Sequence, residues 1–207
     1  MISSDPIITI FSFIVLIFSV ILHELAHGYT AFALGDPTAK YEGRLTFNPI
    51  KHLDAFGSVI LPLLLALSSV PVIIGWAKPV PVNPYNFRDQ KWGEFKVALS
   101  GPATNFAIAL VFGIIIRMFY GFLPVNLIGF FVIVVQLNLV LAFFNLVPIP
   151  PLDGSWILFH FLPENMFKVK MFLQQYGIAI LVFFLVFGGP QIIGQIVDFF
   201  LGIIIGN

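Results

Sequence analysis

Two histidines and a glutamate lie within about one helical turn of each other in Ile21–Asp36, which reads ILHELAHGYTAFALGD. His23 and His27 are four residues apart, so on an α-helix they share one face with Cβ atoms about 5–6 Å apart, close enough to bind one metal ion. Glu24 flanks this face, and its carboxylate can reach a metal-bound water without binding the metal. In such an H-E-x-x-H arrangement, zinc binds both histidines and the glutamate acts as general base.

The apolar context of this motif argues against a chance match. The motif follows the run Ile7–Leu22, which reads IITIFSFIVLIFSVIL. Insertion scales put an Asp, Lys or Arg at the centre of a membrane helix at roughly 2.5–3.5 kcal/mol, and ionisable residues inside membrane spans are functional by default. A chance match would leave this cost unexplained, so we interpret His23, Glu24 and His27 as a functional metal site.

A catalytic zinc site needs a third protein ligand and an open position for water, whose pKa falls to about 7 on the metal. The best candidate ligand is Asp153 in FFNLVPIPPLDGSW, which follows an apolar helix that ends at three prolines. Non-helical backbone at membrane depth is tolerated where protein buries it or water reaches it, as at an active site. Asp153 can alternatively cap a helix that begins near Ser155. Of the other histidines, we expect His52 at a surface or interface and His160 in a structural role.

The composition is that of an all-α polytopic membrane protein. The chain has 207 residues, of which 59% are hydrophobic and 10% are charged, and several apolar runs reach the roughly 17–25 residues needed to cross a bilayer. A net charge of +0 argues against a nucleic-acid partner. The absence of cysteine excludes disulfides and thiolate metal ligands. The first apolar run is too long for a signal peptide and lacks a basic start and a cleavage site, so we expect a retained helix in the cell membrane.

Proline and glycine positions divide the chain into about five predicted transmembrane helices. These are Ile7–Leu34, Phe95–Tyr120, Leu127–Val147, Met171–Phe187 and Gln191–Ile205. We predict one domain over residues 1–207, with a catalytic core at 7–160 and accessory C-terminal helices at 171–205. Lys40–Phe47 alternates apolar and polar side chains and predicts a short β-hairpin at the membrane surface. Its edge either holds an extended substrate segment by strand addition or belongs to a plain surface hairpin.

The remaining apolar stretch, Phe56–Ile74, is predicted to enter the membrane and return on the same side. The two histidines of the motif lie near the C-terminal end of their helix, and Asp153 lies just past the C-terminal end of Leu127–Val147. Both helices must therefore run in the same direction, so the chain between them crosses the membrane an odd number of times. Phe95–Tyr120 supplies that crossing.

The charge distribution supports this topology, because cytoplasmic loops carry excess Lys and Arg. With a re-entrant Phe56–Ile74, every basic residue except Arg117 falls on the side of the metal site. We therefore predict an active site toward the cytosolic side, an outer N-terminus and an inner C-terminus. The polar residues Asn105, Gln136 and Asn138 are expected to join helices through hydrogen bonds, with a position lining the active site as the alternative.

Two separate motifs resemble those of the site-2 protease family of intramembrane zinc metalloproteases. The family pairs a membrane-embedded H-E-x-x-H with a distant motif that begins with N-x-x-P and ends with D-G, and here they stand as His23–His27 and Asn145–Gly154. The intervening GRLTFNPIKHLDAFGSVILP, GWAKPVPVNP and LSGPATNFAIAL also look like the short form of this family, without PDZ or CBS domains. The likeness covers most of Leu22–Ser155, and the last two helices carry no recognised motif.

By this resemblance, His23, His27 and Asp153 would bind one zinc ion, Glu24 would be the catalytic base, and Asn145 would steady the substrate or its oxyanion. The implied function is an intramembrane zinc endopeptidase that cleaves a transmembrane segment of another membrane protein. The alternative is a metal transporter or metal-binding membrane protein without protease activity. A transporter has no need of a base that does not bind metal, and its sites tend to lie at repeat interfaces, whereas this chain has no clear repeat. The sequence does not predict an oligomeric state.

Overall fold

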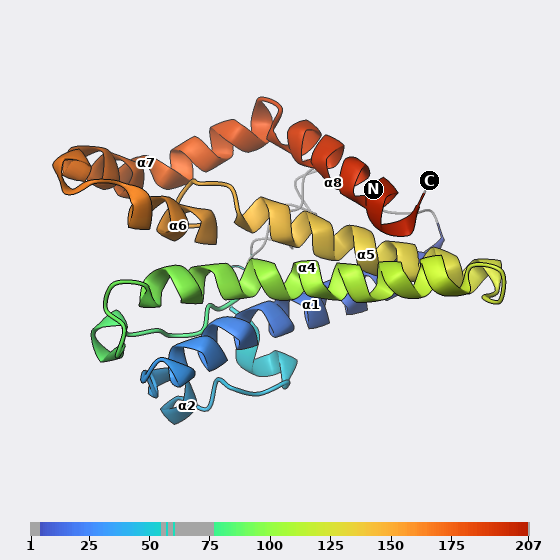
Figure 1. Cartoon of the computed structure of the whole chain (residues 1–207), viewed down its shortest axis with the longest axis horizontal. Helices are drawn as coiled ribbons and strands as arrows, with labels where there is room; N and C mark the ends of the chain where they lie inside the picture. The colour runs from blue at the N-terminus through green and yellow to red at the C-terminus, as the bar shows by residue number, and fades with distance from the viewer. Residues whose placement is uncertain (1–4, 55–56, 58–59, 61–76, 207) are drawn as a thin grey trace.

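The described chain is built from helices joined by turns and loops (Figure 1). The computed structural model describes residues 5–54, 57, 60 and 77–206. Its elements are α1 (Pro6–Ala33), α2 (Thr38–Tyr41), η1 (Pro49–His52), η3 (Pro84–Asn86), α4 (Gly93–Phe119), α5 (Val125–Asn145), α6 (Asp153–Phe161), η4 (Glu164–Met166), α7 (Phe167–Val186) and α8 (Gly189–Ile205). No strand occurs among these residues, so the all-α prediction is confirmed for them.

Four helices of the described part are long and apolar enough to cross a membrane. They are the 28-residue α1, the 27-residue α4, the 21-residue α5 and the 23-residue stretch Glu164–Val186, which contains η4 and α7. The 17-residue α8 is apolar but shorter. The predicted helices therefore lie within a few residues of their expected bounds, and four of them are clearly long enough to cross a membrane.

Local sequence explains where the long helices begin and end. α1 begins at Pro6, whose missing N–H suits the first helical position, and the Asp5 carboxylate accepts a hydrogen bond from the Ile7 N–H at 2.8 Å. Gly35 follows this helix with a φ of 109°, a conformation that glycine adopts without strain. Gly188, with a φ of 111°, likewise separates α7 from α8 and lets α8 start in a new direction.

α1, α4 and α5 form the central bundle, in which α4 lies antiparallel to the other two (Figure 1). His27 of α1 contacts Val97 near the start of α4, whereas Ser19, two turns earlier on α1, contacts Asn105, two turns later on α4. Ser19 also contacts Asn138 of α5. α1 and α5 therefore run in the same direction, as the odd number of crossings requires.

α7 and α8 follow one another in a bent line along one side of this bundle, so that the start of α1 and the end of α8 lie at the same end of the molecule (Figure 1). At that end, Arg117 of α4 donates a hydrogen bond to the Ile203 carbonyl of α8. The predicted C-terminus on the side of the metal site is therefore wrong. An apolar run shows where a helix forms but not its direction, which depends here on Gly188 and on the packing of α8. The buried residues of this packing are Ala109, Ile116, Val135, Leu139, Ile193, Val197 and Ile204.

The predicted β-hairpin at Lys40–Phe47 is also wrong. Thr38–Tyr41 form the helical turn α2, and turns and bends without any strand follow it up to residue 47. The Asp36 carboxylate explains this turn, because it accepts hydrogen bonds from both the N–H and the hydroxyl of Thr38 and so satisfies the start of a helix. A short alternating run carries too little information to outweigh such a local contact.

The predicted re-entrant segment Phe56–Ile74 lies outside the described residues, apart from two isolated positions. Its flanks are described, and they meet. The Lys78 N–H donates a hydrogen bond to the His52 carbonyl at 2.9 Å, and the buried Arg44 guanidinium donates to the Lys78 and Pro79 carbonyls at 2.8 and 3.3 Å. The two flanks of this stretch therefore lie side by side, at the metal-site end of the bundle.

Candidate metal centre

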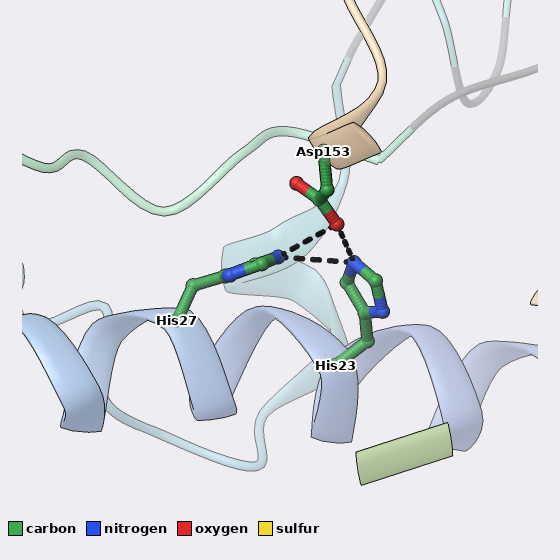
Figure 2. A group of neighbouring side chains, drawn as sticks. All are labelled: His23, His27 and Asp153. Carbon is green, nitrogen blue, oxygen red and sulfur yellow. Dashed lines mark hydrogen bonds and ion pairs between the residues drawn. The ribbon is translucent and has the colours of Figure 1, made fainter. Parts of the chain in front are cut away.

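Three side chains from two distant segments meet at the end of the bundle where α1 ends and α4 begins (Figure 2). His23 and His27 point from α1 toward Asp153, the first residue of α6. The Asp153 Oδ2 lies 3.0 Å from the His23 Nε2 and 3.2 Å from the His27 Nε2, and the two Nε2 atoms are 3.0 Å apart. This cluster can hold a metal ion. The pairing of the first motif with Asp153, which the sequence predicts, is thus present in the structure.

The hydrogen bonds on the far side of each ring determine which nitrogen carries the proton. The His27 Nδ1 lies 2.7 Å from the Val97 carbonyl oxygen, which can only accept, so this Nδ1 must donate. The His23 Nδ1 lies 2.6 Å from the Asn105 Oδ1, another acceptor. Both Nε2 atoms therefore present lone pairs to each other and to the carboxylate. Three acceptors at such short separations repel one another unless a cation lies between them, so the donor set fits a metal ion.

The Asp153 carboxylate serves this cluster and does not cap α6. Within the described residues, its buried Oδ2 has no hydrogen-bond donor, whereas Ser155 bonds through its hydroxyl to the Leu152 carbonyl. Gly154 allows this placement, because a Cβ there would collide with the carbonyl oxygens of Leu146 and Val147. The capping alternative for Asp153 is therefore not what the structure contains.

Gly101 of α4 provides the space in front of the two imidazoles. A Cβ built on this glycine would lie 2.6 Å from the His23 Nε2 and even closer to the His27 Nε2. Zinc–nitrogen bonds measure about 2.0–2.1 Å, so a side chain at this position would compete for the volume that a shared ion needs. Gly101 stands within LSGPATNFAIAL, but its role in front of the imidazoles depends on the packing of α4 against α1, which the sequence does not contain.

Glu24 lies beside this cluster on α1 and is not one of the three converging residues. Its half-buried side chain accepts a hydrogen bond at Oε2 from the Val80 N–H at 2.8 Å. Val80 stands between Pro79 and Pro81, neither of which has an N–H, so it supplies the donor of this short extended stretch. Sequence reasoning missed this partner, although the alternating prolines mark Val80 as the single backbone donor among the three.

The other residues singled out from the sequence each have contacts of their own. Asn145, the last residue of α5, donates its side-chain amide to the Leu141 carbonyl at 2.9 Å. His52 is buried rather than at a surface, with its Nε2 2.8 Å from the Thr46 carbonyl. His160 packs its ring on Trp92 with centroids 4.2 Å apart, in keeping with a structural role. Asn105 is fully buried between helices and also bonds a candidate ligand, so it combines the two alternatives that the sequence left open.

The fold and the cluster together define a polytopic helical membrane protein with a metal site at one end of its bundle. A model of peptidase family M50 matches residues 122–187, which include Asp153. YwhC of Bacillus subtilis, named as a zinc metalloprotease, is 39% identical over 184 residues, which are 86% of this chain and 80% of the relative. The chain therefore belongs to peptidase family M50, which confirms its resemblance to the site-2 proteases, and it is a zinc-dependent peptidase of the membrane.

Two archaeal relatives support the same assignment. MJ0611 of Methanocaldococcus jannaschii is 34% identical over 164 residues, which are 75% of this chain and 74% of that protein. MJ0392 of the same organism is 30% identical over 148 residues, which are 70% of this chain and 32% of that longer protein. Both carry names that describe a zinc metalloprotease. No solved structure matches the chain.

Proposed function

We propose that this chain is an intramembrane endopeptidase that cleaves a transmembrane segment of another membrane protein. In this proposal His23, His27 and Asp153 hold one zinc ion, and Glu24 is the general base. The observation that carries the proposal is that the His23 Nε2, the His27 Nε2 and the Asp153 Oδ2 lie within 3.0–3.2 Å of one another, with the lone pairs of both nitrogens free. Glu24 lies beside the two histidines on α1. The apolar lengths of α1, α4 and α5 support a membrane-embedded setting for this cluster.

The residues of this chain divide the work of peptide hydrolysis between them. A zinc ion held by His23, His27 and Asp153 would supply Lewis acidity, which lowers the pKa of a water and polarises a carbonyl. Glu24 would accept a proton from the attacking water and deliver it to the leaving amine. The Val80 N–H holds one oxygen of the Glu24 carboxylate, which fixes the plane of the group and leaves the second oxygen for the proton. Asn145, whose side-chain amide donates to the Leu141 carbonyl, would steady the reacting segment.

The distribution of charge supports an active site on the cytosolic side of the cell membrane. Two contacts place basic residues at the metal-site end. The Arg88 N–H donates to the Leu34 carbonyl just after α1 at 2.8 Å, and the Lys170 ammonium lies over the Phe159 ring of α6. Arg117 lies at the opposite end of α4. Cytoplasmic ends of membrane proteins carry the excess of basic residues. The other basic residues lie between the end of α1 and the first turn of α4, or in the first turn of α7; they are Lys40, Arg44, Lys51, Lys78, Arg88, Lys91, Lys96, Lys168 and Lys170.

The variant Glu24→Gln tests the proposed function directly. We expect the purified variant to retain one zinc per chain by elemental analysis, because Glu24 is not a ligand, and to lose cleavage of a model transmembrane substrate in proteoliposomes. The matched control is Glu94→Gln, which removes a carboxylate from the start of α4 and should cleave like the wild type. Cleavage by Glu24→Gln at the wild-type rate would contradict the mechanism. Zinc uptake into the same vesicles without any cleavage would show a transporter instead.

A further inference from the structure

A line of buried polar side chains connects the metal site to the middle of α5. Asn105 of α4 and Asn138 of α5 are each 0% exposed, and Ser19 of α1 is 4% exposed. The Asn105 Nδ2 lies 2.9 Å from the Asn138 Oδ1 and 3.3 Å from the Ser19 carbonyl oxygen. The Asn138 Nδ2 lies 3.0 Å from the Ser19 Oγ and 2.9 Å from the Val134 carbonyl oxygen. The three helices of the central bundle each contribute one member.

Each hydrogen bond in this line has a fixed direction. The Val134 carbonyl can only accept, so the amide nitrogen of Asn138 must face it, and the Asn138 oxygen must then face Asn105. The amide nitrogen of Asn105 therefore donates to Asn138 and to the Ser19 carbonyl, which turns the Asn105 oxygen toward the His23 Nδ1 at 2.6 Å. That oxygen requires a proton on Nδ1, which leaves the Nε2 lone pair free for a metal.

The two histidines differ in how their rings are held. His27 bonds through Nδ1 to the Val97 carbonyl. This backbone group is always an acceptor and is held in place by the helix, so it needs no other side chain to orient it. His23 bonds to a side-chain amide, which offers an acceptor or a donor according to which way it is turned. His23 therefore needs a second contact that orients the amide, and Asn138 makes that contact from a helix that holds neither histidine.

We propose that Asn105 and Asn138 are positioning residues that keep the proton of His23 on Nδ1 and so prepare its Nε2 to bind zinc. The proposal rests on the proposed role of His23 as a zinc ligand. Asn105 acts on the ring itself, and Asn138 acts through Asn105. Partners of this kind typically contribute 10–100-fold to metal affinity. A merely adhesive role, in which the two amides hold helices together, would instead change stability and leave the histidine alone.

The ring nitrogens of the histidines report the effect directly. The chain has 4 histidines, so ¹⁵N-histidine labelling of the zinc-free full-length protein gives few signals, and ¹⁵N chemical shifts separate protonated from unprotonated ring nitrogens. We expect the proton on Nδ1 in His23 and His27. In His52, the ring nitrogen that faces the Thr46 carbonyl is Nε2, so this residue should show the opposite tautomer and serves as an internal reference.

Substitutions on α4 and α5 separate positioning from adhesion. We expect Asn105→Leu and Asn138→Leu to move the His23 proton toward Nε2, to leave His27 unchanged, and to weaken zinc binding in chelator competition by about 10–100-fold. Asn138→Asp keeps an acceptor for the Asn105 amide and should restore the wild-type His23 signal. Gln136→Leu, an exposed position on the same helix, is the matched control and should change neither readout. Asn138→Ala is the milder substitution if the leucine variant does not fold.

Two results would overturn the proposal. One is a wild-type protein in which the zinc-free His23 carries its proton on Nε2. The other is an Asn138→Leu or Asn138→Ala protein with lower stability but with an unchanged His23 signal and unchanged zinc affinity. A different result would show that His23 is not a zinc ligand at all. His23→Ala would then bind zinc as the wild type does, whatever tautomer His23 adopts in the zinc-free protein.

Discussion

The central bundle and the C-terminal helix pair are held together by different kinds of contact. α1, α4 and α5 join through buried hydrogen bonds that reach the metal site, such as the pair of His23 with Asn105. All residues of α7 are described, and only Gly177 among them is buried, against Pro150. α8 packs against the bundle through apolar side chains and aromatic rings, such as Phe200 of α8 on Phe143 of α5. The proposed chemistry would therefore depend on the first set of helices together with Asp153 of α6, and the second set would contribute mainly stability.

Gly101→Ala should have the largest effect, because it places a methyl group where the two imidazoles converge. We expect zinc affinity to fall by about 100-fold or more while the helical content stays unchanged, since the substitution favours helix. Chelator competition and far-ultraviolet circular dichroism measure the two quantities. Gly129→Ala on α5 is the control, because nothing lies within 4 Å of its added Cβ. Wild-type zinc affinity in Gly101→Ala would refute the assignment of this space to the ion.

Gly113→Ala tests the other half of the comparison from the same helix. Its Cβ would collide with Ile204 of α8, so the variant should lose about 1–3 kcal/mol of unfolding free energy through overpacking. Its zinc affinity should equal that of the wild type. Detergent-induced unfolding measures the stability, with Gly194→Ala on α8 as the control, because its added Cβ meets nothing within 4 Å. A loss of zinc binding in Gly113→Ala would show that the two regions are coupled.

Asp36→Asn should have the smallest effect, and only on the loops at the metal-site end. Burial alone would raise the pKa of Asp36, but hydrogen bonds from Thr38, Asn83 and Asn86 outweigh it and hold the pKa below its usual value. A lowered pKa means that the carboxylate contributes stability above the unfolded pKa of about 3.9 and loses this contribution as the pH falls through the folded pKa.

The measurement for this variant is stability as a function of pH. We expect Asp36→Asn to be about 1–2 kcal/mol less stable than the wild type at pH 7, because the donors lose a charged acceptor. The difference should shrink as the pH falls below about 4. A difference that stays constant down to the lowest accessible pH would mean that the charge of Asp36 does not stabilise these loops.

The sequence was most informative where the relevant geometry is local. The spacing of His23 and His27 follows from the helix itself. Asp153 stands out because it follows an apolar helix that ends at three prolines, and the odd number of crossings follows from its pairing with the histidines. Asn138 is expected from the sequence to join helices, but its particular contact with Asn105, like the space that Gly101 provides, arises from packing between helices that no spacing within one helix contains. Gln136, grouped with Asn138 by its position, is exposed, whereas Asn138 is buried.

The two wrong predictions have different origins, one in a local contact and one in contacts between segments remote in sequence. The hairpin at Lys40–Phe47 was inferred from alternation alone, and the hydrogen bonds of Asp36 to Thr38 produce a helical turn there instead. The direction of α8 depends on its contacts with α4 and α5, which are remote in sequence. The predicted role of Asn145 stays a prediction, as do the roles proposed for Glu24 and the three ligands.

The placement of the ligand candidates on α1 and α6 has a consequence for how the chain resists unfolding. An ion shared by His27 and Asp153 closes a loop that contains α4 and α5, much as a disulfide would, in a chain that has no cysteine. Closing a long loop removes conformational entropy from the unfolded chain. The native protein should therefore become more stable with the logarithm of the free zinc concentration above the dissociation constant. The same ion that serves hydrolysis would also act as a cross-link between the two ends of the catalytic core.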